Sequence, residues 1–281
     1  MPVVPLVLLF LVGLGLGAGV NVLADELPPD AAGLRGRPRL PRCRACGTTY
    51  AAPHWLASAG LLLGGWRCVQ CGTPRPWRHL LVEVAAGLSL VYLWWWATLG
   101  AVGPTDALGR FLAAAVIVTV FLLIAVIDVE HRLILRVVVV PAAAVVAFLG
   151  LLAPGRGAAK TLLGGLAGYA IVFGIYLLAQ LYMALIARLR GRPLEEVAFG
   201  GGDVNLAAVV GFAVGWPGVL LALLIAIVAG GLYSLGLILF QIVRGRYSPH
   251  GVIPYGPFLI LGALAIYLHG RDIAAWWLGG P

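Results

Sequence analysis

Long apolar runs separated by short polar segments organise most of this sequence. Eight of the runs are near the ~20 residues that an α-helix needs to cross a bilayer. We therefore predict eight membrane-spanning helices, at about residues 3–23, 80–99, 111–127, 133–152, 162–187, 204–216, 219–242 and 253–268. The sixth run is short, and Trp216-Pro217 separates it from the seventh. The predicted fold is an all-α polytopic membrane protein.

Composition supports this fold and excludes a soluble domain. Hydrophobic residues make up 62% of the chain and charged residues 11%, with a mean hydropathy of +1.01, whereas soluble domains carry about 25% charged residues. A secretory signal peptide begins with basic residues, but no Lys or Arg precedes the first run. We therefore predict that the first run is retained as a membrane span. The predicted domains are the first transmembrane helix (1–23), a polar cytoplasmic loop domain (24–79) and a transmembrane core (80–281).

The net charge of +8 comes from basic residues in short loops rather than from a nucleic-acid-binding surface. With the N-terminus outside, fifteen of the nineteen Lys and Arg residues lie in the inside segments 24–79, 128–136, 188–203 and 243–252. Cytoplasmic loops of membrane proteins carry such an excess of basic residues. We therefore predict that the N-terminus is outside, that these segments are cytoplasmic, and that the partners include the lipid bilayer but no nucleic acid.

Several predicted helices carry glycines four residues apart, a spacing that lets helix backbones approach closely. We predict a helix-packing role, without chemistry, for the pairs Gly13 and Gly17, Gly164 and Gly168, and Gly211 and Gly215.

The predicted loop domain contains all four cysteines of the protein. They form two Cys-x-x-Cys pairs, Cys43 with Cys46 and Cys68 with Cys71. Two such pairs can close a tetrahedral thiolate site that suits Zn²⁺, and a site with four Cys ligands is structural because no coordination position stays open. Two disulfides are the alternative, but thiols stay reduced in the cytoplasm. We therefore predict a structural zinc site.

In the stretch from 199 to 206, F-G-G-G-D-V-N-L, three glycines precede Asp203, which lies directly before an apolar run. A carboxylate there is costly and usually has a function or a partner. Because Gly200 and Gly202 have no Cβ, a substrate backbone can come close to Asp203. Asp128 ends the third run on the same predicted side. Two carboxylates a few Å apart share a proton, so one can act as a base on water and the other as an acid toward a carbonyl.

Other functions are compatible with parts of this pattern. Asp128 by itself would be explained as a helix-end charge paired with Arg132. A non-enzymatic membrane scaffold could use the zinc loop to bind a cytoplasmic partner, with both aspartates structural. A proton-coupled transporter would require acids near the bilayer midplane and inverted repeats, and the sequence shows neither.

Taken together, these motifs resemble a known family. Gly200-x-Gly202-Asp203 is the GxGD motif of intramembrane aspartyl proteases, and its combination with Ile127-Asp128, the two Cys-x-x-Cys pairs and eight predicted spans resembles type IV prepilin peptidases. Further matching patches lie at residues 20–22, 77–83 and 253–258. The resemblance covers nearly the whole chain.

The resemblance implies a function for the aspartates. Asp128 and Asp203 would be the catalytic pair of an endopeptidase of the bacterial inner membrane. Its substrates would be type IV prepilins or pseudopilins, whose short basic leader is removed at the cytoplasmic membrane face. Many bacterial members also methylate the new N-terminal residue with S-adenosylmethionine, and the N-terminal cytoplasmic loop is associated with that step.

Two positions depart from the family pattern. Ile134-Leu135-Arg136 stands where the family usually has Leu-Pro-Asp, and Asn205 stands where it usually has Lys. Both aspartates are kept, so we still predict peptidase activity. The acids nearest the predicted site are Glu130, Glu195 and Glu196, and we predict that they contact the basic leader.

Overall fold

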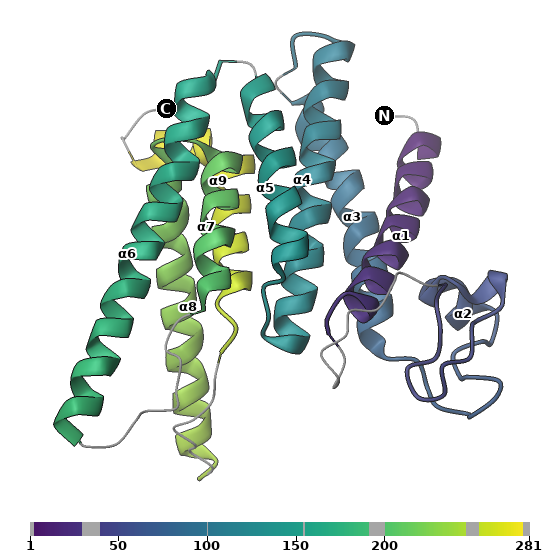
Figure 1. The fold of residues 1–281 in the computed structure, drawn as a ribbon. Coiled ribbons are helices and arrows are strands. Elements are labelled where there is room, and N and C mark those ends of the chain that lie inside the picture. Colours follow the sequence, from purple (N-terminus) through teal and green to yellow (C-terminus); the bar gives the residue numbers. More distant parts are fainter. Residues whose placement is uncertain are drawn as a thin grey trace. The chain divides into compact units, whose positions relative to one another are not determined.

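The computed structural model describes residues 3–29, 40–99, 101–153, 155–190, 200–245 and 253–277. The chain divides into two compact units, Met1–Ile127 and Asp128–Pro281. Helix α4 (Pro104–His131) contains the boundary. Within the described ranges every regular element is helical (Figure 1), which confirms the predicted all-α class.

The first unit packs two antiparallel helices against each other through glycines. Before α4 it contains α1 (Val3–Glu26), the short helices η1 (Ala52–His54) and α2 (Ala57–Leu62), and α3 (Trp77–Thr98). A Cβ on Gly13 would lie 2.5 Å from the Gly87 Cα, and one on Gly17 would lie 2.6 Å from the Glu83 Cα. The predicted Gly13–Gly17 spacing therefore forms this contact, since no larger residue fits there.

The second unit is built around α7. It contains α5 (Arg136–Leu152), α6 (Ala158–Arg190), α7 (Gly201–Val214), α8 (Gly218–Val243) and α9 (Gly256–Trp277), and α7 contacts α5, α6 and α9 (Figure 1). On α6, a Cβ at Gly164 would lie 2.5 Å from the Gly211 carbonyl oxygen, and one at Gly168 would collide with the Ala207 carbonyl. The second predicted glycine pair therefore lets α6 and α7 approach closely.

Residues just before and within the first turn of α6 hold the far end of α7. The Arg156 guanidinium donates to the carbonyl oxygen of Ala213 at 2.5 Å, and the Trp216 amide donates to the Lys160 carbonyl at 2.8 Å. The last carbonyls of a helix have no partner within the helix. Arg156 therefore satisfies a backbone group that would otherwise be unpaired at the end of α7.

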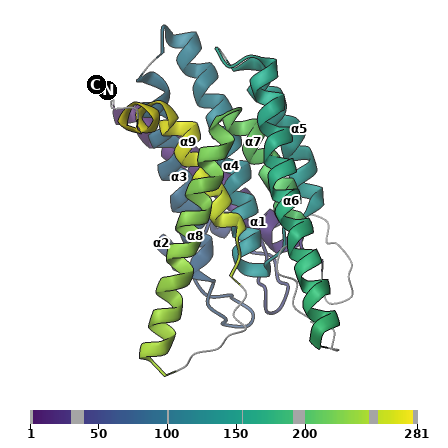
Figure 2. The same ribbon diagram turned by 90° about the vertical axis from the view of Figure 1, so that its left-hand side faces the viewer.

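Five of the described helices are long and apolar enough to cross a membrane: α1, α3, α4, α6 and α8. Three shorter apolar helical stretches are α5, α7 and the part of α9 from Gly256 to Gly270. Each of the eight predicted runs overlaps one of these helices, while the count of eight spans stays a prediction. The exposed face of α6, a helix labelled in Figure 2, carries large apolar side chains such as Leu178 and Leu181, which are 68% exposed. Such faces are typical of helices that contact lipid.

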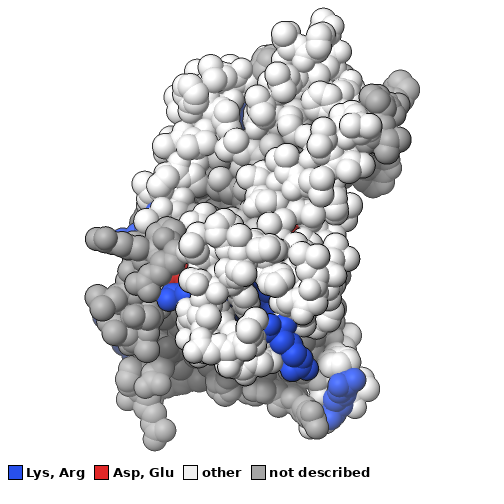
Figure 3. Space-filling model, turned by 90° about the vertical axis from the view of Figure 1, so that its right-hand side faces the viewer, with Lys and Arg blue, Asp and Glu red and all other residues white. Residues whose placement is uncertain are grey.

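Charge is unevenly distributed over the described surface. On the face drawn in Figure 3, basic side chains gather toward one end, and little of the remaining described surface is charged.

Candidate functional site: a four-cysteine centre and a pair of aspartates

The four cysteines form one cluster with the geometry of a metal site. All four are free of disulfides, and their sulfur atoms lie within 4.8 Å of one another. The Sγ atoms of Cys43 and Cys71 are 3.6 Å apart, as are those of Cys46 and Cys68. Zn–S bonds of about 2.3 Å at tetrahedral angles place sulfurs about 3.8 Å apart, whereas a disulfide bond is about 2.0 Å long. The cluster therefore fits a tetrahedral ion, as the sequence predicted.

Each Cys-x-x-Cys pair forms the same tight turn. In the first knuckle (residues 43–48), the Gly47 amide donates to the Cys43 carbonyl at 2.9 Å and the Cys43 amide donates to the Thr48 carbonyl at 2.8 Å. The second knuckle (residues 68–73) repeats these bonds at 2.9 and 3.0 Å. The glycine of each knuckle has a positive φ, 75° and 68°, a backbone conformation that glycine adopts without strain.

A threonine hydroxyl lies beside one sulfur of each knuckle. Thr48 Oγ1 is 3.2 Å from Cys46 Sγ, and Thr73 Oγ1 is 3.2 Å from Cys71 Sγ. The Thr73 hydroxyl lowers the pKa of the Cys71 thiol to about 6, which favours the thiolate that a metal requires. We did not predict a role for these threonines, although the repeated Cys-Gly-Thr sequence is a signal for one.

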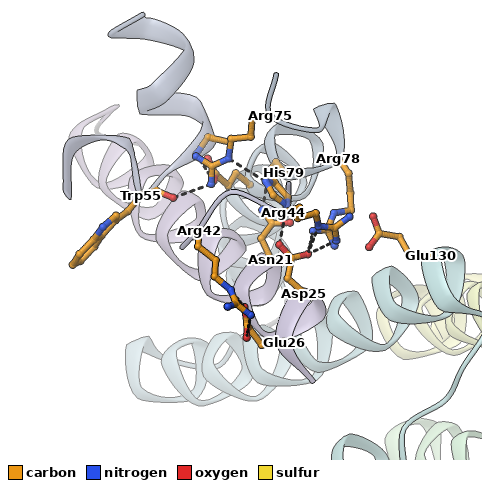
Figure 4. A network of polar contacts seen from close by, with 12 residues as sticks. Asn21, Asp25, Glu26, Arg42, Arg44, Trp55, Arg75, Arg78, His79 and Glu130 are labelled. Carbon is orange, nitrogen blue, oxygen red and sulfur yellow. Dashed lines mark hydrogen bonds and ion pairs between the residues drawn. The ribbon is translucent and has the colours of Figure 1, made fainter. Parts of the chain in front are cut away.

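The first knuckle is joined to the end of α1 by charged pairs (Figure 4). Arg42 donates to both Glu26 carboxylate oxygens, at 2.7 and 2.8 Å. Arg44 donates from Nε to Asp25 at 3.1 Å, and Arg78 at the start of α3 also pairs with Asp25. The arginines on both sides of Cys43 therefore anchor the first knuckle to α1. The bidentate pair of Arg42 with Glu26 makes this contact geometrically specific.

His79 and Arg75 extend this network into the start of α3. Arg75 Nε donates to His79 Nδ1 at 3.0 Å, and His79 Nε2 lies 3.2 Å from Asp25. Because Nδ1 accepts a hydrogen bond, we assign the ring hydrogen to Nε2, facing the carboxylate. Arg75 also donates to the carbonyls of His54 and Trp55 at 2.9 and 3.0 Å, and burial lowers the pKa of its guanidinium. Neither His54 nor His79 belongs to the cysteine cluster.

Glu83 is a completely buried acid on α3 with a defined partner in the loop. Its carboxylate accepts from the amides of Ala57 and Ser58, at 2.6 and 2.8 Å, and from the Ser58 hydroxyl at 2.8 Å. These amides open α2 and have no carbonyl partner within the helix. Glu83 therefore caps α2 from another helix and fixes the loop to α3.

In the second unit, Asp128 lies in the last turn of α4 and is only 4% exposed. Its Oδ2 accepts a hydrogen bond from the Gly256 amide at the start of α9, at 3.0 Å. A Cβ on residue 256 would lie 2.5 Å from that oxygen. Among the described residues Asp128 has no ion pair with Arg132, whose positive φ of 53° turns the chain away from α4. The helix-end pair that would have explained Asp128 alone is therefore not formed.

Asp203 lies in the first turn of α7, the end of a helix that favours an acidic group. Its carboxyl group is close enough to interact electrostatically with Asp128 and with Tyr255. The end of α4 and the starts of α7 and α9 thus bring two acids and the Tyr255-Gly256 segment together. The sequence analysis predicted a role for Asp128 and Asp203. It gave residues 253–258 only as a patch that matches the family, without a role.

The three glycines before Asp203 face different surroundings. A Cβ on Gly202 would lie 2.7 Å from the Ile134 Cβ, so Gly202 allows close packing against the segment before α5. A Cβ on Gly200 would lie 3.3 Å from the Asp203 Oδ2, whereas one on Gly201 would meet open space. Asn205 donates to the Gly201 carbonyl at 3.2 Å. The residue that replaces the usual Lys is therefore bonded to its own helix.

The acids predicted to contact a leader are only partly described. Glu130 lies in the last turn of α4, where its carboxylate is 3.7 Å from His131 Nε2. Glu195 and Glu196 lie outside the described residues.

These features define a class of protein: a helical membrane protein with four clustered thiols that could hold a metal ion in one unit and two neighbouring helix-end aspartates in the other. Residues 115–235 match the type IV leader peptidase family, and residues 11–97 match the bacterial peptidase A24 N-terminal domain. The chain therefore belongs to the type IV leader peptidase family.

Curated relatives match over most of their length. Three proteins named prepilin leader peptidase/N-methyltransferase, from Aeromonas hydrophila, Bacillus subtilis and Burkholderia pseudomallei, are 27%, 24% and 29% identical to the chain. The matches cover 96%, 96% and 92% of this chain and 93%, 97% and 83% of the relatives. No solved structure is significantly similar to the chain.

Proposed function

We propose that the protein is an aspartyl endopeptidase of the bacterial inner membrane that removes the short basic leader from type IV prepilins or pseudopilins. Relatives named prepilin leader peptidase/N-methyltransferase match nearly the whole chain. The observation that carries the proposal for this molecule is that the Asp203 carboxyl group, at the start of α7, lies near enough to Asp128, at the end of α4, to interact with it electrostatically.

The chemistry follows from two neighbouring carboxyl groups of which one holds a proton. The ionised group takes a proton from water, the water oxygen attacks the scissile carbonyl carbon, and the protonated group donates to the carbonyl oxygen. Collapse of the tetrahedral intermediate breaks the C–N bond, and a proton passes to the leaving nitrogen. The Gly256 amide donates to Asp128 Oδ2 and so holds one of these carboxyl groups in place.

The remaining assignments concern substrate contact and orientation. Gly200 and Gly202 border Asp203, and Glu130, Glu195 and Glu196 would attract the basic leader. With the N-terminus outside, the excess of Arg in the loops puts the site on the cytoplasmic side. The domain boundaries near residues 23 and 79 belong to this proposal too.

The proposal includes two bound groups. Cys43, Cys46, Cys68 and Cys71 would hold a structural Zn²⁺, which stabilises the fold of the loop. S-adenosylmethionine would supply the methyl group for the new N-terminus, because the relatives are named as N-methyltransferases as well as peptidases.

The test is co-expression of the protein with a candidate prepilin, followed by mass spectrometry of the pilin N-terminus. We expect leader removal with the wild type and none with Asp128→Asn or Asp203→Asn. A methylated mature N-terminus would establish the second activity in the same spectrum. Cleavage that both variants retain would contradict the assigned dyad, and a scaffold would show no cleavage in any of the three.

A further inference from the structure

An uncharged stretch interrupts the polar loop of the first unit. Residues 55–66, W-L-A-S-A-G-L-L-L-G-G-W, contain no charged side chain, although the segment 24–79 around them carries eight arginines. Helix α2 forms the first half of this stretch, and Gly64 then reverses the chain with a φ of 77°. At the tip, the side chains of Leu62 and Leu63 are 84% and 63% exposed. We call residues 55–66 the apolar turn.

The apolar turn has a fixed base, so the exposure of its leucines is a property of the fold. The Arg75 guanidinium donates to the Trp55 carbonyl at 3.0 Å, and the Arg75 amide donates to the Trp66 carbonyl at 2.9 Å. A Cβ on Gly60 would lie 3.4 Å from the Gly65 carbonyl oxygen, so the two arms pack closely. Exposed apolar patches of this kind mark sites of contact with protein or membrane.

Two contacts place the apolar turn alongside the membrane-spanning helices of the first unit rather than beyond their ends. Glu83 accepts from the first amides of α2 and lies six residues after Trp77, where the candidate span of α3 begins, about 9 Å along the helix. Gly17 packs against the Glu83 backbone, and α1 continues nine residues further to Glu26, about 13 Å. Figure 1 shows α2 level with the lower half of α1. Interfacial helices bury their apolar face to a depth of about 5–10 Å, which matches this position.

The apolar turn is also continuous with the outward face of α3. The ring centroids of Trp66, at the end of the turn, and Trp77, at the start of α3, are 4.7 Å apart. From Trp77 the exposed face continues through Leu81 and Leu88, whose spacing places them on one side of the helix. Tryptophan is enriched where headgroups meet hydrocarbon. One uninterrupted apolar surface therefore joins the tip of the turn to the side of a candidate membrane span.

We propose that the apolar turn inserts into the adjoining lipid leaflet, with Leu61, Leu62 and Leu63 among the acyl chains and the Trp66–Trp77 pair at the level of the headgroups. The loop between α1 and α3 then has a membrane anchor in its middle as well as at both ends, and this anchor holds the cysteine cluster close to the membrane surface. The inference concerns the first unit and does not depend on peptidase activity or methyl transfer.

The second knuckle provides a matched control position. Val69 is apolar and 97% exposed, but it belongs to the cysteine cluster, which Arg42 anchors to Glu26 at the very end of α1. A fluorescent amino acid is incorporated at position 62 or 69 of the full-length protein in nanodiscs of phosphatidylcholine and phosphatidylglycerol. Lipid brominated in its acyl chains should quench position 62 at least about twofold more strongly than position 69. Iodide in the buffer should quench the two positions in the opposite order.

Quenching of position 62 by iodide but not by brominated lipid would overturn the proposal, because the tip would then face water. Shielding of position 62 from both quenchers would also overturn it, and would indicate a protein cover such as a second copy of the chain. A measurement on the wild type covers the case in which the labelled chain does not fold. Phosphatidylcholine with a diazirine in its acyl chain should label residues 61–63 as well as Leu81 and Leu88, and label on α3 alone would contradict insertion.

Discussion

At the scale of single residues, Gly256 and Asp128 form the contact on which the proposed peptidase site depends. The two residues are 128 positions apart in the chain, and one backbone amide holds one carboxylate oxygen at 3.0 Å. A side chain at position 256 would occupy the space of that oxygen. The backbone of α9 thus sets the position of an acid on α4, and glycine is required for it.

We expect Gly256→Ala to lower prepilin cleavage about 100-fold, since a misplacement near 1 Å can cost that much. Gly231→Ala on α8 is the control, because a Cβ there meets open space, and it should keep activity within about twofold. Cleavage is followed by the change in pilin mass in detergent extracts with equal amounts of each variant. Full activity of Gly256→Ala would show that Asp128 does not need this contact.

Glu83 leads to a prediction about stability. Glu83→Ala would leave the first amides of α2 without an acceptor in a buried place, and we expect a loss of about 2–4 kcal/mol in the stability of the first unit. Asp106→Ala is the comparison, because its single bond to the Val102 amide is exposed, and it should cost less than about 1 kcal/mol. Denaturant unfolding in detergent reports both values, and equal losses would mean that the cap contributes little.

The sequence singled out Asp128 and Asp203 but not the residues that contact them. Asp128 and Asp203 stood out because acids are rare in this chain and because three glycines precede one of them. The roles of Gly256, Glu83 and the knuckle threonines depend on contacts between segments far apart in the chain. A pattern of apolar and polar positions carries no information about such pairs.

At the scale of elements, the two knuckles show how a loop with little apolar core keeps one conformation. The four sulfurs converge although the two knuckles are 19 residues apart between Thr48 and Cys68. Each knuckle satisfies its own backbone groups, and the metal would join the two.

We expect one zinc ion per chain in protein purified without chelator, as measured by plasma mass spectrometry. A strong chelator should release the ion and make residues 40–75 sensitive to protease, while the second unit stays resistant. Cys43→Ser should lower the zinc content in the same way. Protection of the loop that persists after zinc is lost would argue against a structural metal.

The contact between α6 and α7 gives another prediction, because two glycines of α6 differ only in their surroundings. Gly168 lies against the Ala207 backbone, whereas a Cβ at Gly174 meets open space. We expect Gly168→Val to lower the melting temperature and the peptidase activity, because overpacking costs about 1–3 kcal/mol or more and α7 carries Asp203. Gly174→Val should change neither. Thermal unfolding in detergent compares them, and similar melting temperatures would contradict the close packing.

Most of the large elements were predictable from the sequence. Every predicted run overlaps a helix, because a long apolar run in a membrane protein must satisfy its backbone groups internally. The short α7 was also expected from its flanking glycines and proline. The small helices η1 and α2 were not predicted, because only tertiary contacts such as the Glu83 cap define them.

At the scale of the whole molecule, the chain separates two kinds of chemistry. The four-cysteine cluster belongs to the first unit, and both aspartates belong to the second. In the sequence the cysteines cluster in one polar insertion, whereas Asp128 and Asp203 border apolar runs. The boundary coincides with the end of the third predicted apolar run at residue 127, although helix α4 continues past it to His131.

The unequal lengths of α6 and α7 have a consequence for the hydration of the proposed site. Gly168 faces Ala207, one turn from Asp203, so α6 continues past Asp203 from about residue 172 to 190 (Figure 1), about 27 Å at 1.5 Å per residue. Much of this extension is exposed and apolar, as at Leu178 and Leu185. If lipid surrounds it, Asp203 lies below the surface of the hydrocarbon layer, which is about 30 Å thick.

Water for hydrolysis would then have to travel down from the headgroups. We expect cleavage to be faster in vesicles of short-chain lipid than in vesicles of long-chain lipid, because a thinner layer shortens that path. Rates are compared at equal protein content and with the same prepilin. A rate independent of acyl-chain length would place Asp203 at the aqueous boundary.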